Sequence, residues 1–184
     1  TNTMIYIWHK HPATPKEAKG NIGYLVQNYL FSIVQSMLNA RLNELTQTAQ
    51  PPFIAAVAED GDFLLAKTPS AFAGLAIAQD NGIDTALAAL VREIERAKKF
   101  GFTASEYARA KADYLRYLES AYNERSKTRN SQYVNEYVRH FIDNEPIPGI
   151  ETEYALMNQI APSIPLEVIN SVLPQIIKDE NIVI

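Results

Sequence analysis

Apolar residues recur at steps of three and four over residues 22–45, and they form the longest periodic stretch in the chain. An α-helix gathers such positions on one face, so the pattern predicts an amphipathic helix of about seven turns. Residues 14–17 (TPKE) have the form of a capping box with proline at the first helical position. Because two glycines weaken that first turn, we expect a later start for the main helix, and the proline pair at 51–52 ends it.

Short apolar runs on either side of this helix predict β-strands. Residues 4–8 (MIYIW) are β-branched and aromatic, which favours a strand before the helix. Three apolar runs follow the helix: residues 53–58, 63–67 and 71–79. The turn signals DG at 60–61 and TP at 68–69 separate them, so we expect an antiparallel meander of three strands. The final residues, 181–184 (NIVI), look like the start of another strand.

Two cap signals mark further helices. Asp84 predicts the N-cap of a helix that Gly101 stops, because glycine tolerates the left-handed conformation that ends many helices. Thr103 and Glu106 form a capping box, and the apolar residues flanking Thr103–Glu106 form a hydrophobic staple. A second long helix is therefore expected to begin at Thr103.

Shorter helices are expected in the last third of the chain. One begins beyond Ser131, and its predicted buried side consists of Tyr133, Val134, Tyr137, Val138, Phe141 and Ile142. Two small helices follow, around residues 151–160 and 166–177, and Pro174 is expected to kink or shorten the second of them.

Composition places the chain among ordinary globular proteins. It has 184 residues, 47% of them hydrophobic and 21% charged, so a single domain over residues 1–184 is the expectation. A net charge of -4 without clustered Lys and Arg argues against a nucleic-acid partner. The absence of cysteine excludes thiolate catalysis and disulfides, and no apolar run is long enough to span a membrane. The start without Met and the strand-like end suggest a fragment of a larger protein.

The histidines are the first candidates for metal chemistry. His9 and His11 lie two apart on a predicted strand, so both rings leave the same face and are placed to share a zinc ion. Zinc needs three or four ligands, which favours histidines at a strand end without metal. His140 and the four residues after it resemble the motif H-x-x-E-H, but the second histidine is missing. We therefore expect a helix C-terminus, where His140 faces the negative end of the dipole.

Other sites have weaker support. Residues 119–129 are rich in charge and allow a chamber wall or a partner surface, although a solvated helix end is the favoured interpretation. The ten tyrosines at helical spacing favour packing at the edge of the core over a peptide-binding surface. Serine hydrolase and phosphate-binding motifs are missing from the sequence.

Two motifs resemble one known family. Residues 38–45 (LNARLNEL) look like the S-R-L-x-x-x-L helix segment of the pitrilysin/insulinase (M16) zinc peptidases, and residues 51–53 (PPF) stand where that helix hands over to a strand. Residues 102–111 (FTASEYARAK) resemble the T-x-x-E-L-x-R-A-K helix opening of the same family. Their combination and spacing resemble the C-terminal-type, non-catalytic domain of these enzymes.

The resemblance implies a fold, a parent enzyme and the expectation that catalytic and metal-binding residues lie outside this chain. The fold would be α+β and two-layered, with an antiparallel sheet covered by long helices, of the LuxS/MPP-like metallohydrolase type. Zinc would be bound by an H-x-x-E-H helix in a different domain of the parent, so no catalytic, metal-binding or cofactor-binding residue is expected here. The substrate-holding Arg and Tyr of some such domains align with Thr46 and Phe53, which replace neither the cation nor the phenol hydroxyl.

Three functions follow for testing. The first is a non-catalytic domain of a zinc metalloendopeptidase, inactive by itself, which gives structural support and forms a chamber wall for peptide substrate. The alternative is a protein-binding or scaffold module of an inactive peptidase homologue. A standalone α+β enzyme using His9 and His11 is the third. The expected partners are the other domains of the parent and, in the parent, peptide; the compartment is left open, with a periplasmic or secreted bacterial parent as one option.

Overall fold

The computed structural model describes residues 3–64 and 66–184, which group into two compact units. The first unit holds the residues up to Ala13, Val34–Thr103 and Leu166–Ile184, and it contains the sheet. The second unit holds Thr14–Ile33 and Ala104–Pro165, and its regular elements are helical. The long helix α2 (Ile22–Thr46) contributes residues to both units, and whether residues 1–184 form a single domain stays a prediction.

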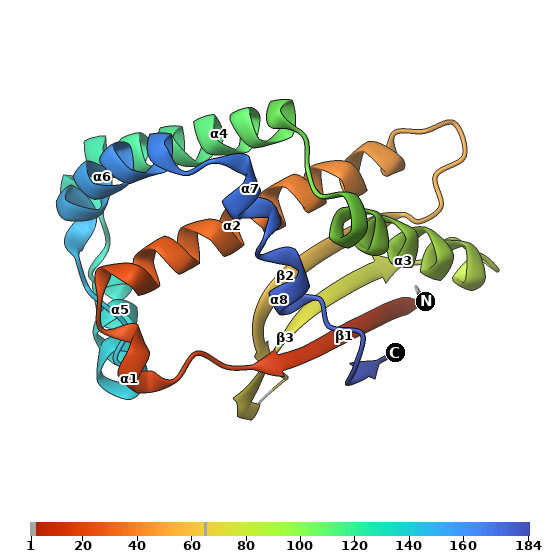
Figure 1. Ribbon diagram of the computed structural model, residues 1–184, viewed down its shortest axis with the longest axis horizontal. Coiled ribbons are helices and arrows are strands. Elements are labelled where there is room, and N and C mark those ends of the chain that lie inside the picture. The colour runs from red at the N-terminus through yellow and green to blue at the C-terminus, as the bar shows by residue number, and fades with distance from the viewer. Residues whose placement is uncertain (1–2, 65) are drawn as a thin grey trace. The chain divides into compact units, whose positions relative to one another are not determined.

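The sheet has four antiparallel strands in the order β2-β3-β1-β4, as Figure 1 shows. They are β1 (Met4–Pro12), β2 (Ala55–Phe63), β3 (Ala66–Ile77) and β4 (Ile182–Val183). The strand predicted at residues 4–8 is confirmed and continues to Pro12, and β4 confirms the strand expected at the end of the chain. With the helices described below, the predicted α+β architecture is confirmed.

The predicted meander of three strands is wrong, because two longer strands replace it. Asp60 lies inside β2 opposite Phe72, and Pro69 lies inside β3 opposite Pro12, so neither turn signal produces a turn. β2 ends at Phe63 instead, and Leu64 after it has a φ of +55°. A side-chain contact of Asp60 with β1, the strand beyond β3, explains why its turn propensity is overridden.

Asp60 is held by a histidine from β1, across the intervening strand β3. His11 Nε2 lies 2.7 Å from Asp60 Oδ1, and the two side chains are 8% and 7% exposed. His11 Nδ1 lies 3.1 Å from the carbonyl oxygen of Pro12, so both ring nitrogens face acceptors. Burial lowers the pKa of His11, but the hydrogen bond and the charge of Asp60 raise it, and the net result is a pKa above the ordinary value of 6.5.

Strand β2 is an outer strand, and side chains of α2 bind its free backbone edge. Asn39 Nδ2 donates to the carbonyl oxygen of Ala58 at 2.9 Å, and Asn39 Oδ1 accepts from the Ala58 N–H at 2.7 Å. One turn earlier on the helix, Gln35 Nε2 donates to the carbonyl oxygen of Asp60 at 3.5 Å. Outer strands that leave such groups open pair with other chains, so Asn39 closes this edge to an added strand.

Helix α2 is confirmed, but the capping box predicted at residues 14–17 is wrong. A short helix, α1 (Lys16–Lys19), begins after Pro15 without a side-chain cap, and Thr14 Oγ1 accepts a hydrogen bond from Gln27 Nε2 instead. The chain then breaks before α2, where Asn21 Oδ1 accepts from the N–H of Tyr24 at 3.2 Å. Asn21 therefore satisfies an amide at the start of α2, the role the sequence suggested for Thr14.

Helix α3 (Ile83–Phe100) packs on the buried face of the sheet. A Cβ atom built on Gly74 of β3 would lie 2.8 Å from Ile94 Cδ1, so the missing side chain permits this close approach. The predicted cap at Asp84 is wrong, since Gly82 occupies the N-cap position and Asp84 lies in the first turn. The predicted stop is confirmed: Gly101 has φ of +70°, and its N–H donates to the carbonyl oxygen of Ala97.

The remaining helices follow the prediction with one break. They are α4 (Ala104–Asn123), η1 (Arg125–Lys127), α5 (Asn130–Asp143), α6 (Gly149–Ile160), η2 (Ala161–Ser163), α7 (Leu166–Asn170) and α8 (Leu173–Ile176). The helix expected over residues 166–177 is divided into α7 and α8, so its continuity is wrong, whereas the expectation of a shortened helix is confirmed. Pro174 lies in the first turn of α8, where its missing N–H needs no partner.

The predicted buried side of α5 is exposed. None of its residues is buried, and its apolar members range from Tyr133 at 39% exposed to Phe141 at 85%. The prediction of a helix is confirmed, but the prediction of burial is wrong for the described structure. Periodicity identifies a face suited to apolar contact and does not say which element supplies that contact.

We predict that Asn39→Ala lowers the free energy of unfolding by about 1–3 kcal/mol, because it leaves the backbone groups of the buried Ala58 without their partner. Urea unfolding followed by circular dichroism measures this change. Asn43→Ala, at an exposed position of the same helix, shares the change in helix propensity and should stay within about 0.5 kcal/mol of wild type. Equal effects of the two substitutions would contradict the closed edge.

We predict that the stabilisation from the His11–Asp60 pair is fully present below pH 6.5 and is lost as the pH rises through the raised pKa of folded His11. The protonated ring binds Asp60 in the folded state, so deprotonation removes an interaction that the unfolded chain lacks. Unfolding free energies from about pH 5.5 to about pH 8.5 measure the loss. Asp60→Asn keeps an acceptor without the charge and should flatten this dependence; an unchanged slope in that variant would rule out the pair as its source.

Candidate functional site

The two positions aligned with substrate-holding residues of the family lie in the sheet-containing unit. Phe53 is fully buried at 0% exposed, so its ring belongs to the core. Thr46 is the last residue of α2, and its hydroxyl donates to the carbonyl oxygen of Asn43 at 2.7 Å. Both side chains are thus engaged within the fold, and a direct role of Thr46 and Phe53 in holding substrate finds no support in their contacts.

The two strand histidines point to the same face of the sheet, and hydrogen bonds occupy both. His9 is 4% exposed, and its Nδ1 donates to the carbonyl oxygen of Lys178 at 2.7 Å. His11 contacts Asp60 and the backbone of Pro12, as described above. Among the described residues, no group of three His, Asp or Glu side chains is placed to hold a metal ion. Structural hydrogen bonds therefore account for both rings.

The third histidine lies at the end of α5. His140 Nδ1 donates to the carbonyl oxygen of Glu145 at 2.7 Å, and the N–H of Asn144 donates to the carbonyl oxygen of His140. Asn144 has φ of +56°, which ends the helix in the left-handed conformation. The prediction that His140 sits at a helix C-terminus is confirmed, and this segment is structural.

The open face of the sheet is aromatic, which the sequence analysis did not identify. Tyr6 and Trp8 of β1 stack with ring centroids 4.8 Å apart, and Phe63 of β2 meets the Trp8 ring edge-on at 5.9 Å. Lys10 Nζ lies 5.3 Å from the centroid of the Phe63 ring. These side chains alternate along β1 with the buried residues of the core, and Tyr6 is 37% exposed. The signal in the sequence was the position of Tyr6, Trp8 and Lys10 at every second residue of the predicted strand, which places them on one face.

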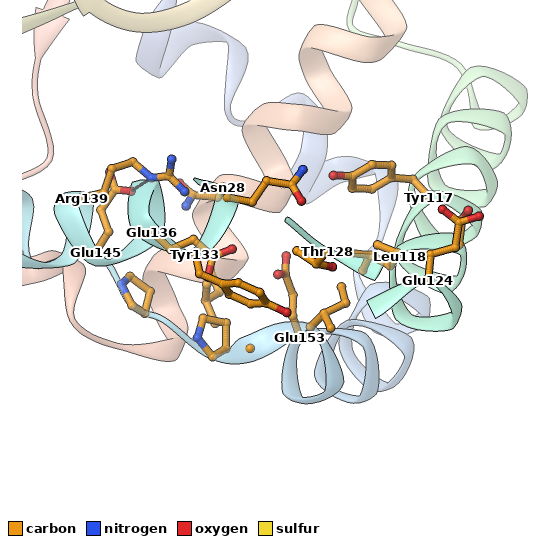
Figure 2. A pocket seen from close by; sticks show the side chains of 18 of the residues that line it. Asn28, Tyr117, Leu118, Glu124, Thr128, Tyr133, Glu136, Arg139, Glu145 and Glu153 are labelled. Carbon is orange, nitrogen blue, oxygen red and sulfur yellow. Dashed lines mark ion pairs between the residues drawn. The ribbon is translucent and has the colours of Figure 1, made fainter. Parts of the chain in front are cut away.

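The helical unit contains a cavity of about 590 Å³, shown in Figure 2. Side chains from the first part of α2, the end of α4, α5 and the start of α6 line it. The ionisable and aromatic residues in its wall are Tyr24, Tyr117, Glu124, Lys127, Tyr133, Glu136, Arg139, Glu145 and Glu153. This volume is within the usual range of small-ligand sites.

One corner of the cavity is a satisfied ionic network around Glu145. Tyr24 donates its hydroxyl hydrogen to Glu145 Oε1 at 3.2 Å, Lys19 Nζ lies 3.7 Å from the same oxygen, and Arg139 Nε lies 3.2 Å from Oε2. Burial, followed by the charge and hydrogen bond of Glu145, raises the pKa of Tyr24 to about 12. The phenol therefore stays protonated and acts as a donor.

The charge-rich segment 119–129 is partly engaged in this unit. Arg125 lies over the Tyr122 ring at 4.2 Å, donates through Nη1 to the carbonyl oxygen of Tyr122, and donates through Nε to Glu151 at 3.0 Å. Glu124 and Lys127 line the cavity, so the segment is more than the solvated helix end that the sequence favoured. Tyrosines behave as predicted where Tyr29 and Tyr107 are buried, with their hydroxyl oxygens 3.3 Å apart.

No helix in the described part of the chain has the length and apolar character needed to cross a membrane.

Comparison with known proteins gives one relative in sequence and several in fold. No protein-family model matches the chain. A protein named zinc protease PQQL-like, from Arabidopsis thaliana, is 27% identical over 143 residues, which cover 76% of this chain and 12% of that protein. The chain thus spans about an eighth of the curated relative that it matches.

Solved structures share the fold at lower identity. The first half of the periplasmic protease PqqL from Escherichia coli matches with a TM-score of 0.84 and 18% identity, over 98% of this chain and 38% of that one. A peptidase M16 inactive domain from Pseudomonas fluorescens matches with a TM-score of 0.66 and 12% identity, over 99% of this chain and 40% of that one. The sequence relative and the shared fold confirm the resemblance indicated by the motifs: the chain is related to the M16 zinc peptidases and has the fold of their domains, inactive ones among them.

Proposed function

We propose that the chain is a non-catalytic domain of a zinc metalloendopeptidase, which supports the parent enzyme and forms part of the wall of its peptide chamber. The observation that carries this proposal is the aromatic open face of the sheet, where Tyr6, Trp8 and Phe63 contact one another and leave ring surface accessible. Aromatic surface of this kind provides contact area at low conformational cost. It suits transient contact with unfolded peptide of varied sequence.

The hydrogen bonding of β2 favours peptide contact with the open face of the sheet over pairing of a peptide strand with β2. Peptides often bind by pairing with an open outer strand, which gives affinity through main-chain hydrogen bonds. In this chain the outer strand β2 is occupied at Ala58 by both polar atoms of Asn39. A wall role that uses side-chain rings is therefore the better match to the geometry.

Zinc and proteolysis belong to the parent in this proposal. The Arabidopsis relative carries zinc protease in its name, and the family resemblance implies a zinc site in another domain. In this chain the candidate donors His9 and His11 are engaged by Lys178, Pro12 and Asp60. They act in this proposal as structural residues of the sheet.

A scaffold module is the second candidate, and the inactive domain from Pseudomonas fluorescens favours it. In that case the parent would have lost its zinc motif and would serve to bind other proteins. An intact H-x-x-E-H in the parent's neighbouring domain supports the peptidase, while an eroded motif supports the scaffold. The open reading frame of the parent distinguishes the two.

We predict that the purified 184-residue chain binds no stoichiometric zinc and cleaves no peptide. Calorimetric zinc titration and a fluorogenic peptide assay measure both properties, with an intact M16 peptidase as the positive control. Tight uptake of one zinc ion per chain, or cleavage that a chelator abolishes, would contradict the non-catalytic assignment. His9→Ala combined with His11→Ala would then show whether the two strand histidines are responsible.

We predict that Trp8→Ala in the full-length parent lowers kcat/KM for an unfolded peptide substrate by about three- to tenfold, because it removes ring surface from the open face. Phe100→Ala is the matched control, since Phe100 is 75% exposed on α3 and lies outside this aromatic cluster. Thermal unfolding of both variants checks that the fold is retained. Equal kcat/KM for Trp8→Ala and wild type would exclude a wall role for this face.

A further inference from the structure

Two partly exposed carboxylates in the cavity wall of the helical unit lack a cation among the described residues, and a third, Glu124, is exposed to solvent. In the described part of the chain, Glu136 of α5 and Glu153 of α6 have neither a hydrogen bond nor an ion pair, although both side chains are only partly exposed. Glu145, in the same wall, is bound by Tyr24, Lys19 and Arg139. Glu145 therefore shows that basic side chains of this unit can pair with a carboxylate in this wall.

The charge of Glu136 disfavours the charged form of Glu153. Burial, and then the charge of Glu136, raises the pKa of Glu153 above its ordinary value. A positive group bound near Glu153 in the cavity would relieve both effects, because it replaces lost hydration and offsets like-charge repulsion.

The cations already in the wall do not supply this charge. Arg139 Nε is committed to Glu145 at 3.2 Å. Lys127 lies in the short helix η1, is exposed, and forms no ion pair with Glu136 or Glu153 in the described structure. The cavity thus has anionic groups in excess of its available cations.

An aromatic ring lines the same cavity as the carboxylates. Figure 2 shows the Glu153 carboxyl group projecting from α6 into the cavity, whose wall also includes Thr128 and the ring of Tyr133. Tyr117 and Leu118 of α4 add ring and aliphatic surface to the same wall. A tyrosine face attracts cations, most strongly where water is partly excluded. Charge, ring surface and apolar surface are therefore combined in one half-open cavity.

The same unit already holds cations in this manner at two places. Arg125 lies 4.2 Å from the Tyr122 ring centroid and donates to Glu151. Lys19 Nζ lies 5.6 Å from the Tyr24 ring centroid and 3.7 Å from Glu145. In both cases a tyrosine ring and a glutamate share one basic side chain. Tyr133 with Glu136 and Glu153 repeats the set of groups without the basic residue.

We propose that this cavity binds a guanidinium or ammonium group carried on an aliphatic stem, as in an arginine or lysine side chain of a peptide or in a free alkylamine. Glu153 and Glu136 neutralise the charge, Tyr133 stacks against it, and Leu118 contacts the stem. The cavity is formed by the helical unit alone, so this inference goes beyond the proposed peptidase role and does not depend on it.

Titration of the 184-residue chain with blocked amino acids tests the site directly. Acetyl-arginine methylamide is the probe, and acetyl-citrulline methylamide is its neutral control, because citrulline keeps the shape of the side chain and removes its charge. We expect saturable binding of the arginine probe by NMR, and binding of the citrulline probe that is weaker by roughly tenfold or more. Equal affinities, or no saturable binding of arginine, would overturn the proposal.

Variants of the cavity residues test which side chains contact the arginine probe. Glu153→Gln and Glu136→Gln should each weaken arginine binding by about tenfold, and Tyr133→Ala by about threefold, while Glu119→Gln, at an exposed position of α4 outside the cavity, should leave it unchanged. Circular dichroism checks folding, and Tyr133→Ala on the exposed helix α5 provides an independent test if a Gln variant does not fold. Unchanged affinity in all three cavity variants would refute the site.

A second ligand distinguishes the sources of the cation. Agmatine carries the guanidinium on an alkyl stem without a peptide backbone. Tighter binding of acetyl-arginine methylamide than of agmatine assigns the site to peptide side chains, and equal binding assigns it to alkyl cations in general. Failure of both ligands would overturn the inference while leaving the zinc and cleavage results of the isolated chain untouched.

Discussion

The hydrogen bonding of the outer strand β2 is the constraint on which the sheet-containing unit depends. A strand at the end of a sheet presents backbone groups that need partners, and Asn39 gives Ala58 both a donor and an acceptor. This contact fixes α2 along the edge of the sheet within that unit. The His11–Asp60 pair then ties β1 to β2 across β3, so the strands are linked by side chains as well as by their ladders. The aromatic face remains as the open surface of the sheet.

A second asparagine, Asn170 of α7, likewise binds both backbone groups of a residue distant in sequence, Phe102. Asn170 Oδ1 accepts from the N–H of Phe102 at 2.9 Å, and Asn170 Nδ2 donates to its carbonyl oxygen at 3.3 Å. Gly101 makes this contact possible, because a Cβ atom there would lie 2.6 Å from the Asn170 side chain. The glycine thus ends α3 and also admits α7 close to the backbone. A primary amide is the side chain that can replace one missing peptide neighbour, since it carries both kinds of group.

The sequence predicted the positions of the helices better than the contacts that the helices and strands make with one another. Long periodic patterns identified α2 and the existence of α3 and α4, because a repeated apolar face is a local property. Asp60-Gly61 was read as a turn, but the partner that holds Asp60 in a strand is His11, far away in the chain. The apolar side of α5 was recognised and its burial was not, because contact depends on the positions of other elements. Distant partners therefore explain these errors.

The candidate sites show the same limit. Motif spacing at residues 38–45 and 102–111 was enough to find the family, since both motifs are continuous in sequence. The cavity was missed because its lining comes from four helices and shares no spacing that identifies a site. Counts of tyrosine and glutamate did not reveal that Tyr133, Glu136 and Glu153 line one cavity. The structure shows that Arg139 is paired with Glu145, which leaves Glu136 and Glu153 without a cation among the described residues.

Burial of Phe53 explains why the chain's departure from the family pattern at this position is compatible with a stable fold. A phenol hydroxyl placed where Phe53 lies, at 0% exposed, would need a hydrogen-bond partner, whereas the benzene ring adds apolar contact without that requirement. Thr46, at the end of α2, likewise satisfies its hydroxyl within the helix through Asn43. Both positions therefore contribute to packing and helix termination. The proposed contact with peptide therefore relies on the open sheet face, whose rings contact one another while retaining accessible surface.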